Sequence, residues 1–256
     1  GWEVDPTCIR PVPDVLEAFE VFLREIVRAG NSIVVPTPAY MPFLSVPRLY
    51  GVEVLEIPML CAGAGESSGR NDEWLFDFDA IEQAFANGCH AFVLCNPHNP
   101  IGKDLAAKYD VRIFSDEIHA PFVYQGHTHV PFASINRQTA MQAFTSTSAS
   151  KSFNIPGTKC AQVILTNPDD LELWMRNAEW SEHQTATIGA IATTAAYDGG
   201  AAWFEGVMAY IERNIALVNE QMRTRFAKVR YVEPQGTYIA WLDFSPLGID
   251  DPADYF

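Results

Sequence analysis

The chain has 256 residues, of which 48% are hydrophobic and 19% charged, and its 17 Lys and Arg face 32 Asp and Glu for a formal net charge of −15. This balance excludes an intrinsically disordered chain, which combines low hydrophobicity with high charge, and it supports a large buried core. The length suits one large domain, or one domain with part of another. The excess negative charge argues against nucleic acid as a partner, because a phosphate backbone would be repelled.

The hydrophobic runs and the spacing of cysteines and histidines argue against a membrane protein, a disulfide-rich protein and a metal-binding protein. No apolar run approaches the roughly 20 residues that a membrane span needs, so we expect no membrane partner. The 5 cysteines are scattered without a Cys-x-x-Cys pair, which favours reduced thiols in a cytoplasmic protein over a disulfide framework or a zinc site. The pair His127 and His129 lacks a third ligand, so we expect no metal.

Hydrophobic periodicity and turn residues predict helices and strands that alternate along much of the chain. In the first helix Val15, Phe19 and Ile26 recur on one face, and Gly30 follows the last turn. In chain order the elements are a helix between Pro13 and Gly30, a strand over 32–36, a helix over 42–49, a strand over 53–57, a loop over 61–72, a helix over 77–86, strands over 91–95, 111–114, 143–145 and 161–165, a helical block over 169–228 broken near 199–200, and strands over 229–232 and 237–242.

The strands over 91–95 and 111–114 are continuously apolar, which is typical of a parallel sheet covered on both faces. We therefore predict an α/β fold, a three-layer sandwich with a mostly parallel central sheet over residues 1–228. Residues 229–256 would begin a smaller α+β domain. Only eight residues separate Gly102 from Val111, whereas a parallel crossover needs about a dozen, so we expect a segment to be missing near 103–104.

Polar motifs follow the predicted strands, where α/β sheets place their ligands. They are Pro-Thr-Pro-Ala-Tyr at 36–40, Asn-Pro-His-Asn-Pro-Ile-Gly at 96–102, Ser-Asp-Glu-Ile-His-Ala-Pro at 115–121, and Ser-Ala-Ser-Lys-Ser-Phe-Asn at 148–154 with a further lysine at 159. In this order they resemble the fold-type I pyridoxal-phosphate enzymes of the aminotransferase class I/II superfamily. The strings at 115–121 and 148–154 are most similar to the cystathionine β-lyase (C–S lyase) subfamily.

The resemblance implies a pyridoxal 5′-phosphate cofactor bound by the lysine motif. Lys151 would hold the cofactor aldehyde as a Schiff base and act as the catalytic base. Ser148 and Ser150 would donate their hydroxyls to the phosphate, and Lys159 would add a positive charge there. Many relatives carry Arg in place of Lys159, and a lysine lacks the bidentate geometry of that side chain.

The pyridine ring would contact residues of three other motifs. Asp116, at the end of a buried strand, would pair with the protonated ring nitrogen, and Asn99 would donate to the oxygen of the ring hydroxyl. His119 either shares that hydroxyl contact or is structural. Tyr40 would stack on the ring.

The helix that opens at Asp14 and Val15 corresponds to the turn that cups the phosphate, because free N–H groups and the helix dipole favour an anion. Relatives usually carry Gly, Ser or Thr where Asp14 stands, and its carboxylate could cap the same N–H groups and compete with the phosphate.

The resemblance implies a β-elimination lyase that converts cysteine S-conjugates to thiol, pyruvate and ammonia, working as a homodimer with shared active sites. The alternatives are an aminotransferase with the same cofactor and a non-catalytic regulatory or binding protein on the same fold. The arginine that binds the substrate carboxylate in relatives has no counterpart here, because Arg213, Arg223, Arg225 and Arg230 lie too early in the chain. We therefore expect this chain to be part of a longer enzyme.

Overall fold

We describe the protein from a computed structural model. The structure describes residues 2–62, 73–96, 110–249 and 255. Asn99, most of the Gly- and Ser-rich loop and the expected break near 103–104 lie outside these residues.

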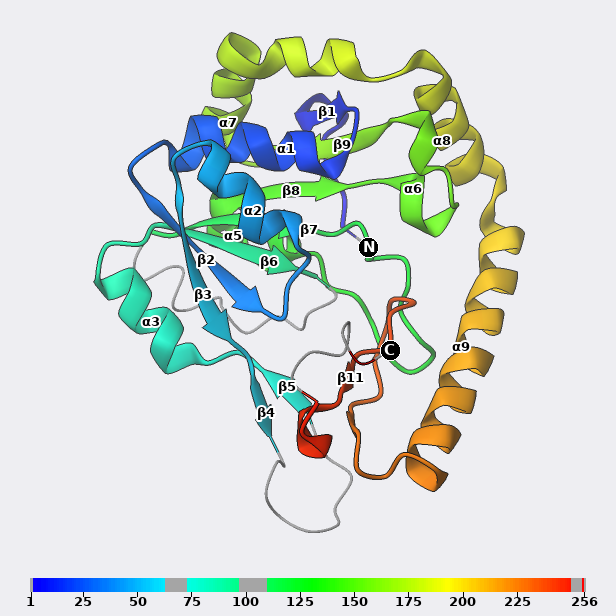
Figure 1. Ribbon diagram of the computed structural model, residues 1–256. Helices are drawn as coiled ribbons and strands as arrows, with labels where there is room; N and C mark the ends of the chain where they lie inside the picture. Colours follow the sequence, from blue (N-terminus) through cyan, green and yellow to red (C-terminus); the bar gives the residue numbers. More distant parts are fainter. Residues whose placement is uncertain (1, 63–72, 97–109, 250–254, 256) are drawn as a thin grey trace.

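A mixed sheet of seven strands forms the centre of the molecule (Figure 1). Its order across the sheet is β1 (Ile9–Val12), β9 (Ala161–Ile164), β8 (Ala143–Thr147), β7 (Arg112–Asp116), β6 (Ala91–Cys95), β2 (Ser32–Thr37) and β3 (Glu53–Pro58). The pairs from β8 through β3 are parallel, whereas β9 runs antiparallel to both β8 and β1. The prediction of a mostly parallel α/β sheet is confirmed.

The remaining elements surround or extend this sheet. The helices are α1 (Val15–Val21), the π-helix η2 (Phe22–Val27), α2 (Pro42–Leu49), α3 (Phe78–Ala86), α5 (Arg137–Gln142), α6 (Ala149–Ser152), α7 (Pro168–Leu173), the π-helix η5 (Trp174–Ala178), α8 (Thr187–Gly199) and α9 (Ala201–Thr224). Short 3-10 helices are η1 (Pro6–Cys8), η3 (Phe132–Ser134), η4 (Pro156–Thr158), η6 (Glu179–Gln184) and η7 (Ser245–Leu247). Two small sheets pair β4 (Leu60–Ala62) with β5 (Glu73–Leu75), and β10 (Arg230–Tyr231) with β11 (Leu242–Asp243).

The sheet separates two hydrophobic cores, because successive side chains of a strand point to opposite faces. In β7, Phe114 joins Phe19, Phe22 and other side chains of α1, η2 and α2, while Ile113 joins the core beneath α3. The adjacent strand β6 alternates in the same way. Both faces of the strands are therefore buried, which explains their continuously apolar sequences.

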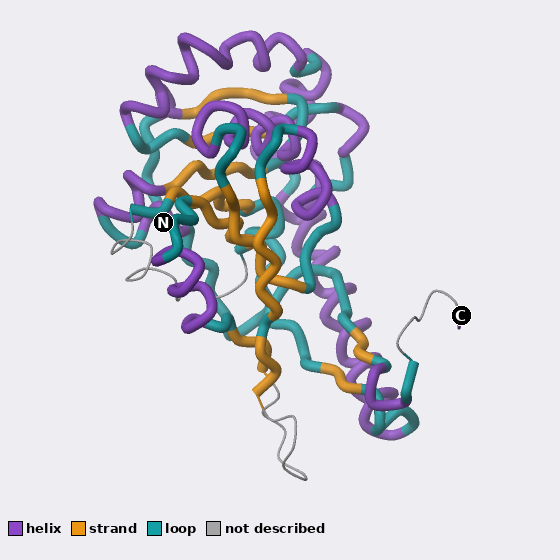
Figure 2. Tube along the Cα trace, turned by 60° about the vertical axis from the view of Figure 1, so that its left-hand side comes forward, coloured by secondary structure: helices purple, strands orange, loops and turns teal. Residues whose placement is uncertain are grey.

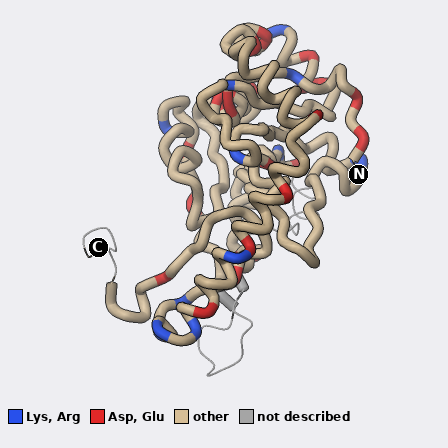
Figure 3. Tube along the Cα trace, turned by 90° about the vertical axis from the view of Figure 1, so that its right-hand side faces the viewer, with Lys and Arg blue, Asp and Glu red and all other residues tan. Residues whose placement is uncertain are grey.

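The chain leaves the sheet through α8 and α9, and α9 runs along one side of the molecule toward the β10–β11 pair (Figure 1). In the turned view the β4–β5 pair extends away from the sheet (Figure 2). Acidic positions are distributed along most of the trace (Figure 3). Over the described residues, no helix combines the length and apolar character that crossing a membrane requires.

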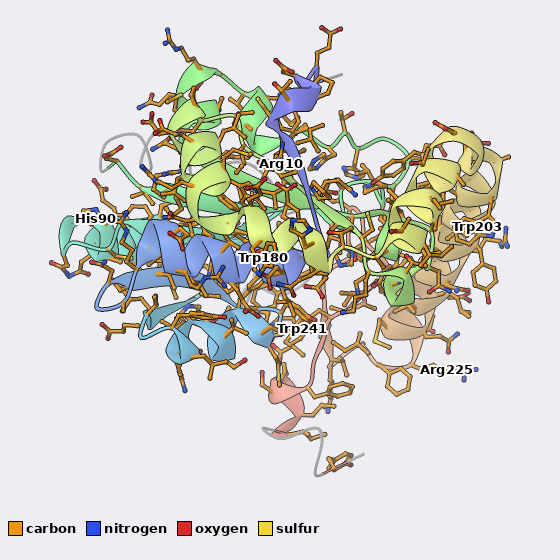
Figure 4. The ribbon with its side chains drawn as sticks, turned by 90° about the horizontal axis from the view of Figure 1, so that it is seen from above. Arg10, His90, Trp180, Trp203, Arg225 and Trp241 are labelled. Atoms are coloured by element: carbon orange, nitrogen blue, oxygen red, sulfur yellow. The ribbon has the colours of Figure 1, made fainter. Side chains whose placement is uncertain are left out.

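The helix α2 and the strand β6 have the predicted bounds. The first predicted helix begins as expected, with Asp14 as N-cap, but continues from Phe22 as a π-helix. Arg10 of β1, labelled in the view from above (Figure 4), donates to Glu182 of η6 at 2.6 and 2.9 Å.

The predicted strand over 237–242 is wrong, since only Leu242–Asp243 forms a strand there. Its β-branched and aromatic residues favour a strand locally, but Tyr238, Ile239 and Trp241 are exposed. The start of the segment bonds instead to the loop after β7, through an isolated bridge between Val123 and Gly236. Tertiary contacts thus override the local propensity.

Candidate active site

The predicted site residues that the structure describes all lie at one edge of the sheet. Parallel strands end at the same edge, so Tyr40 after β2, Asp116 at the end of β7 and Lys151 after β8 are brought together. The strand β1 runs in the same direction as β8 and delivers Asp14 to this edge. Because β9 runs the opposite way, it begins here, directly after Lys159 and Cys160.

Asp116 is a buried carboxyl, 9% exposed. Burial is the main cause that raises its pKa from 3.8 to about 6; the neighbouring charge of Glu117 adds to the rise, and the Lys151 ammonium opposes it. One carboxylate oxygen accepts a hydrogen bond from the Ile118 N–H at 3.1 Å. The ionised form is therefore held at a cost, and a positively charged N–H donor placed against it would stabilise it.

Lys151 lies on the short helix α6, which begins directly after β8. Ser148 caps this helix: its hydroxyl oxygen accepts from the Ser150 N–H at 3.0 Å, and its proton is donated to the carbonyl of Cys160 at 2.7 Å. Ser148 thus ties the lysine helix to the start of β9, while Ser150 is partly exposed and Lys151 is exposed. The proton that was expected to reach a phosphate is used inside the protein in this conformation.

Asp14 and Lys159 form an ion pair, with 2.8 Å between Lys159 Nζ and Asp14 Oδ2. Asp14 also caps α1, because its other oxygen accepts from the Glu17 N–H at 3.0 Å. Burial opposes the ionisation of Asp14, but the hydrogen bonds from Lys159 and Glu17 outweigh it and lower the Asp14 pKa. The two residues expected at the phosphate therefore bind each other, and Val15 beside them is buried at 7% exposure.

Gly189 of α8 allows close packing around Lys159. A Cβ at this glycine would lie 2.2 Å from the carbonyl oxygen of Thr158 and 3.0 Å from that of Lys159. The Lys159 carbonyl also accepts from the Ala186 N–H at 3.1 Å. The helix α8 thereby fixes the backbone that carries the Lys159 ammonium.

His119 and Tyr40 lie on loops at the same edge. The Nδ1 atom of His119 is 2.9 Å from the hydroxyl of Thr237, and its ring centroid is 5.2 Å from that of Tyr238. Tyr40 is 58% exposed and its ring packs edge-on against Phe43, with 5.7 Å between centroids. The Tyr40 face thus remains open to a planar ligand.

Glu117 is a buried acidic residue that the sequence reasoning did not select. Its Oε1 accepts from the Ser115 hydroxyl at 3.0 Å and from the Phe132 N–H at 2.9 Å, and its Oε2 lies 3.2 Å from His129 Nε2. His129 therefore turns its side chain, which is 12% exposed, inward from an otherwise exposed loop. The sequence signal that could have identified Glu117 is the acidic pair Asp116-Glu117 at the end of an apolar strand.

The described residues contain no cluster of three or more His, Cys, Asp and Glu side chains able to hold a metal ion. The assembled edge instead offers an amine, a buried carboxylate, small hydroxyls and an exposed aromatic ring. Such a set can bind a planar ring that carries an aldehyde, a basic nitrogen and an anionic group. Asn99, which was also predicted here, lies outside the described residues.

The family model for aminotransferase class I and II matches residues 15–254. A cystathionine beta-lyase of Corynebacterium glutamicum is 32% identical over 262 residues, covering 98% of this chain and 67% of that protein. The cystathionine beta-lyase PatB of Bacillus subtilis is 32% identical over 266 residues, covering 98% and 66%. The solved structure of cystalysin from Treponema denticola, which contains a pyridoxal 5′-phosphate cofactor, has a TM-score of 0.87 and 26% identity, covering 99% of this chain and 66% of that one.

The chain spans about two thirds of the length of these relatives. The family model extends over most of its residues, and the cystathionine β-lyase of C. glutamicum matches nearly all of it. The chain belongs to the aminotransferase class I and II family.

Proposed function

We propose that the protein is a pyridoxal-phosphate-dependent carbon–sulfur β-lyase that cleaves cysteine S-conjugates such as cystathionine to a thiol, pyruvate and ammonia. The observation that carries the proposal is the buried Asp116 carboxyl, with its raised pKa, at the same edge of the sheet as Lys151. The identity to cystathionine β-lyases over nearly the whole chain supports the choice of reaction.

The residues present fit the cofactor. Asp116 needs a cationic N–H partner, and a protonated pyridine nitrogen is one. The exposed amine of Lys151 lies on the helix next to Asp116's strand, close enough that its charge acts on the carboxyl. Lys159 offers a positive charge beside the N-terminus of α1, where an anionic phosphate is favoured.

When bound, the cofactor supplies an electron sink that stabilises negative charge at the substrate Cα. Lys151 Nζ removes the Cα proton, and the sulfur leaves from Cβ as a thiolate. Asp116 would accept a hydrogen bond from the ring nitrogen and so favour its protonated form. Tyr40 would offer its aromatic ring for stacking on the cofactor, and Lys159, once released from Asp14, would hold the phosphate.

The reaction is tested with cystathionine and the purified protein loaded with pyridoxal phosphate. We expect release of thiol and pyruvate without any keto-acid acceptor, complete loss of both in Lys151→Ala, and unchanged release in Lys228→Ala as a matched control. Product formation only when a keto acid is present would instead identify an aminotransferase. A protein that never acquires the cofactor's absorbance near the visible edge would identify a non-catalytic relative.

We also propose that the protein acts as a homodimer in the cytoplasm. Tyr40 and Met41, at the edge that carries the site, are 58% and 77% exposed, and a second copy would cover such side chains. Cys8, Cys89, Cys95 and Cys160 are free thiols. Light scattering on the purified protein gives the expected mass of two chains, whereas a monomeric mass at micromolar concentration contradicts the dimer.

A further inference from the structure

We propose that Thr237 is a positioning residue for His119: its hydroxyl donates to His119 Nδ1 and thereby holds the neutral imidazole with its proton on Nε2. The two atoms are 2.9 Å apart. His119 belongs to the loop directly after Asp116, whereas Thr237 lies 118 residues later, in the segment between β10 and β11. The consequence for catalysis rests on the proposed function, but the hydrogen bond itself does not.

The backbone of Thr237 is held against the loop after β7 from both sides. Its N–H donates to the carbonyl of Phe122 at 2.7 Å, and its own carbonyl accepts the hydroxyl proton of Tyr124. Two residues earlier, the carbonyl of Gln235 accepts from the Tyr124 N–H at 3.1 Å. These bonds leave little freedom in where the Thr237 side chain points.

Gly236 makes the close approach possible. A Cβ at this position would lie 2.3 Å from the Phe122 carbonyl oxygen, so any other residue would push the two segments apart. Gly236 is buried and pairs with Val123 in an isolated bridge. In the sequence Gly236-Thr237, the glycine thus allows the close approach to Phe122, and the threonine supplies the side chain that contacts His119.

Thr237 adopts a left-handed backbone conformation with φ of 63°. A β-branched residue is a genuine outlier there, and Gly or Asn would be the ordinary choice for such a turn. Strained residues of this kind persist where the surroundings over-determine them, and they cluster at functional sites. A hydroxyl required at this position explains why a threonine stands where the backbone disfavours it.

The direction proposed for this hydrogen bond specifies one form of the imidazole. In neutral histidine one ring nitrogen donates and the other accepts, so a hydroxyl that donates to Nδ1 leaves the proton on Nε2. The rings of Phe122 and Tyr238, with centroids 5.9 and 5.2 Å from that of His119, limit its rotation. With its proton on Nε2, His119 would donate to an oxygen acceptor, such as the hydroxyl oxygen of a bound pyridine ring.

The tautomer is measured directly in the cofactor-free protein by long-range ¹H–¹⁵N NMR of the histidine side chains, with His119 assigned from His119→Gln. We expect the Nε2–H form in the wild type and in Thr237→Ser, which keeps the hydroxyl. Thr237→Val has nearly the same shape but no hydroxyl, and we expect its His119 to lose the Nδ1 acceptor signal. Thr224→Val, which loses a hydroxyl bonded at 2.7 Å to the Glu220 carbonyl, should match the wild type.

A wild-type protein with the proton on Nδ1 overturns the proposal, and so does a Thr237→Val variant with unchanged His119 signals. The NMR measurement on the wild type tests the proposal even if Thr237→Val does not fold.

In the cofactor-loaded protein, we expect Thr237→Val to lower kcat about tenfold, with a shifted cofactor absorbance band and little change in KM, and Thr237→Ser to recover most of it. A protein without any cofactor band refutes the proposed function and leaves the NMR result standing. A normal band with unchanged kcat in Thr237→Val refutes the role of Thr237 alone.

Discussion

Replacing Asp116 by asparagine removes a buried charge that the cofactor-free protein accommodates poorly. Burial raises the pKa of Asp116 from 3.8 to about 6 in the folded protein. A rise of that size favours the protonated carboxyl over the carboxylate by about 3 kcal/mol in the fold. Above about pH 6 the folded protein therefore contains an ionised carboxyl at a cost of up to about 3 kcal/mol, which the unfolded chain does not bear.

The sign of the pH dependence follows from proton binding. Between pH 3.8 and about 6, folded Asp116 holds more proton than unfolded Asp116, so this residue makes the protein less stable as the pH rises through that window. Below the window the carboxyl is protonated in both states and the cost is absent. The asparagine side chain of the variant stays neutral at every pH, so the stability of the variant relative to the wild type should increase from low to high pH.

The assay is urea unfolding of the cofactor-free wild type and Asp116→Asn at about pH 4 and about pH 7.5. Any cost of burying the amide N–H groups is the same at both pH values and cancels in the comparison. We expect the difference in unfolding free energy to move in favour of the variant by about 2–3 kcal/mol between the two conditions. Asp198→Asn, at an exposed position of α8, is the matched control. A difference that is constant with pH, or that moves in favour of the wild type, would refute the reasoning.

Other substitutions test the rest of the site. Asp14→Ser keeps a good N-cap and breaks only a half-exposed ion pair, so the cofactor-free protein should lose less than about 1 kcal/mol of unfolding free energy in urea. The substitution also frees Lys159 to bind phosphate, so the Kd for pyridoxal phosphate should fall several-fold. Weaker binding of pyridoxal phosphate would contradict this prediction. Glu117→Ala leaves the buried Phe132 N–H and Ser115 hydroxyl without their acceptor, and it should lower the unfolding free energy by about 3 kcal/mol or more in the same assay. Glu117→Gln should have a smaller effect. A loss below about 1 kcal/mol in Glu117→Ala would show that these hydrogen bonds do not stabilise the fold.

Local patterns in the sequence were sufficient for much of the fold. The bounds of α2 and β6 follow from proline at a helix start and from an uninterrupted apolar run. The strand ends then predict which residues share an edge, because parallel strands deliver their last residues to one side. Asp116 and Lys151 were identifiable for this reason, at positions only 35 residues apart in the chain.

Features that depend on distant pairing were not predictable in this way. The direction of β9 depends on the chain returning through α6 and η4 on the same edge, and nothing in its own residues encodes that. Burial of the Glu117–His129 pair needs the loop between them to fold back over the strand. The contact of Thr237 with His119 joins residues 118 positions apart, and the residues after Thr237 favour a strand that does not form.

Lys151 is the residue that should carry the cofactor. The chain contains 5 lysines, at 103, 108, 151, 159 and 228, so peptide mapping can distinguish them. The protein loaded with pyridoxal phosphate is reduced with borohydride, which makes the cofactor–lysine bond permanent, and is then digested for mass spectrometry. We predict the phosphopyridoxyl group on Lys151 alone and its absence from Lys151→Ala. Modification of a different lysine, Lys159 included, or no mass gain on any lysine, would contradict the assignment of this site.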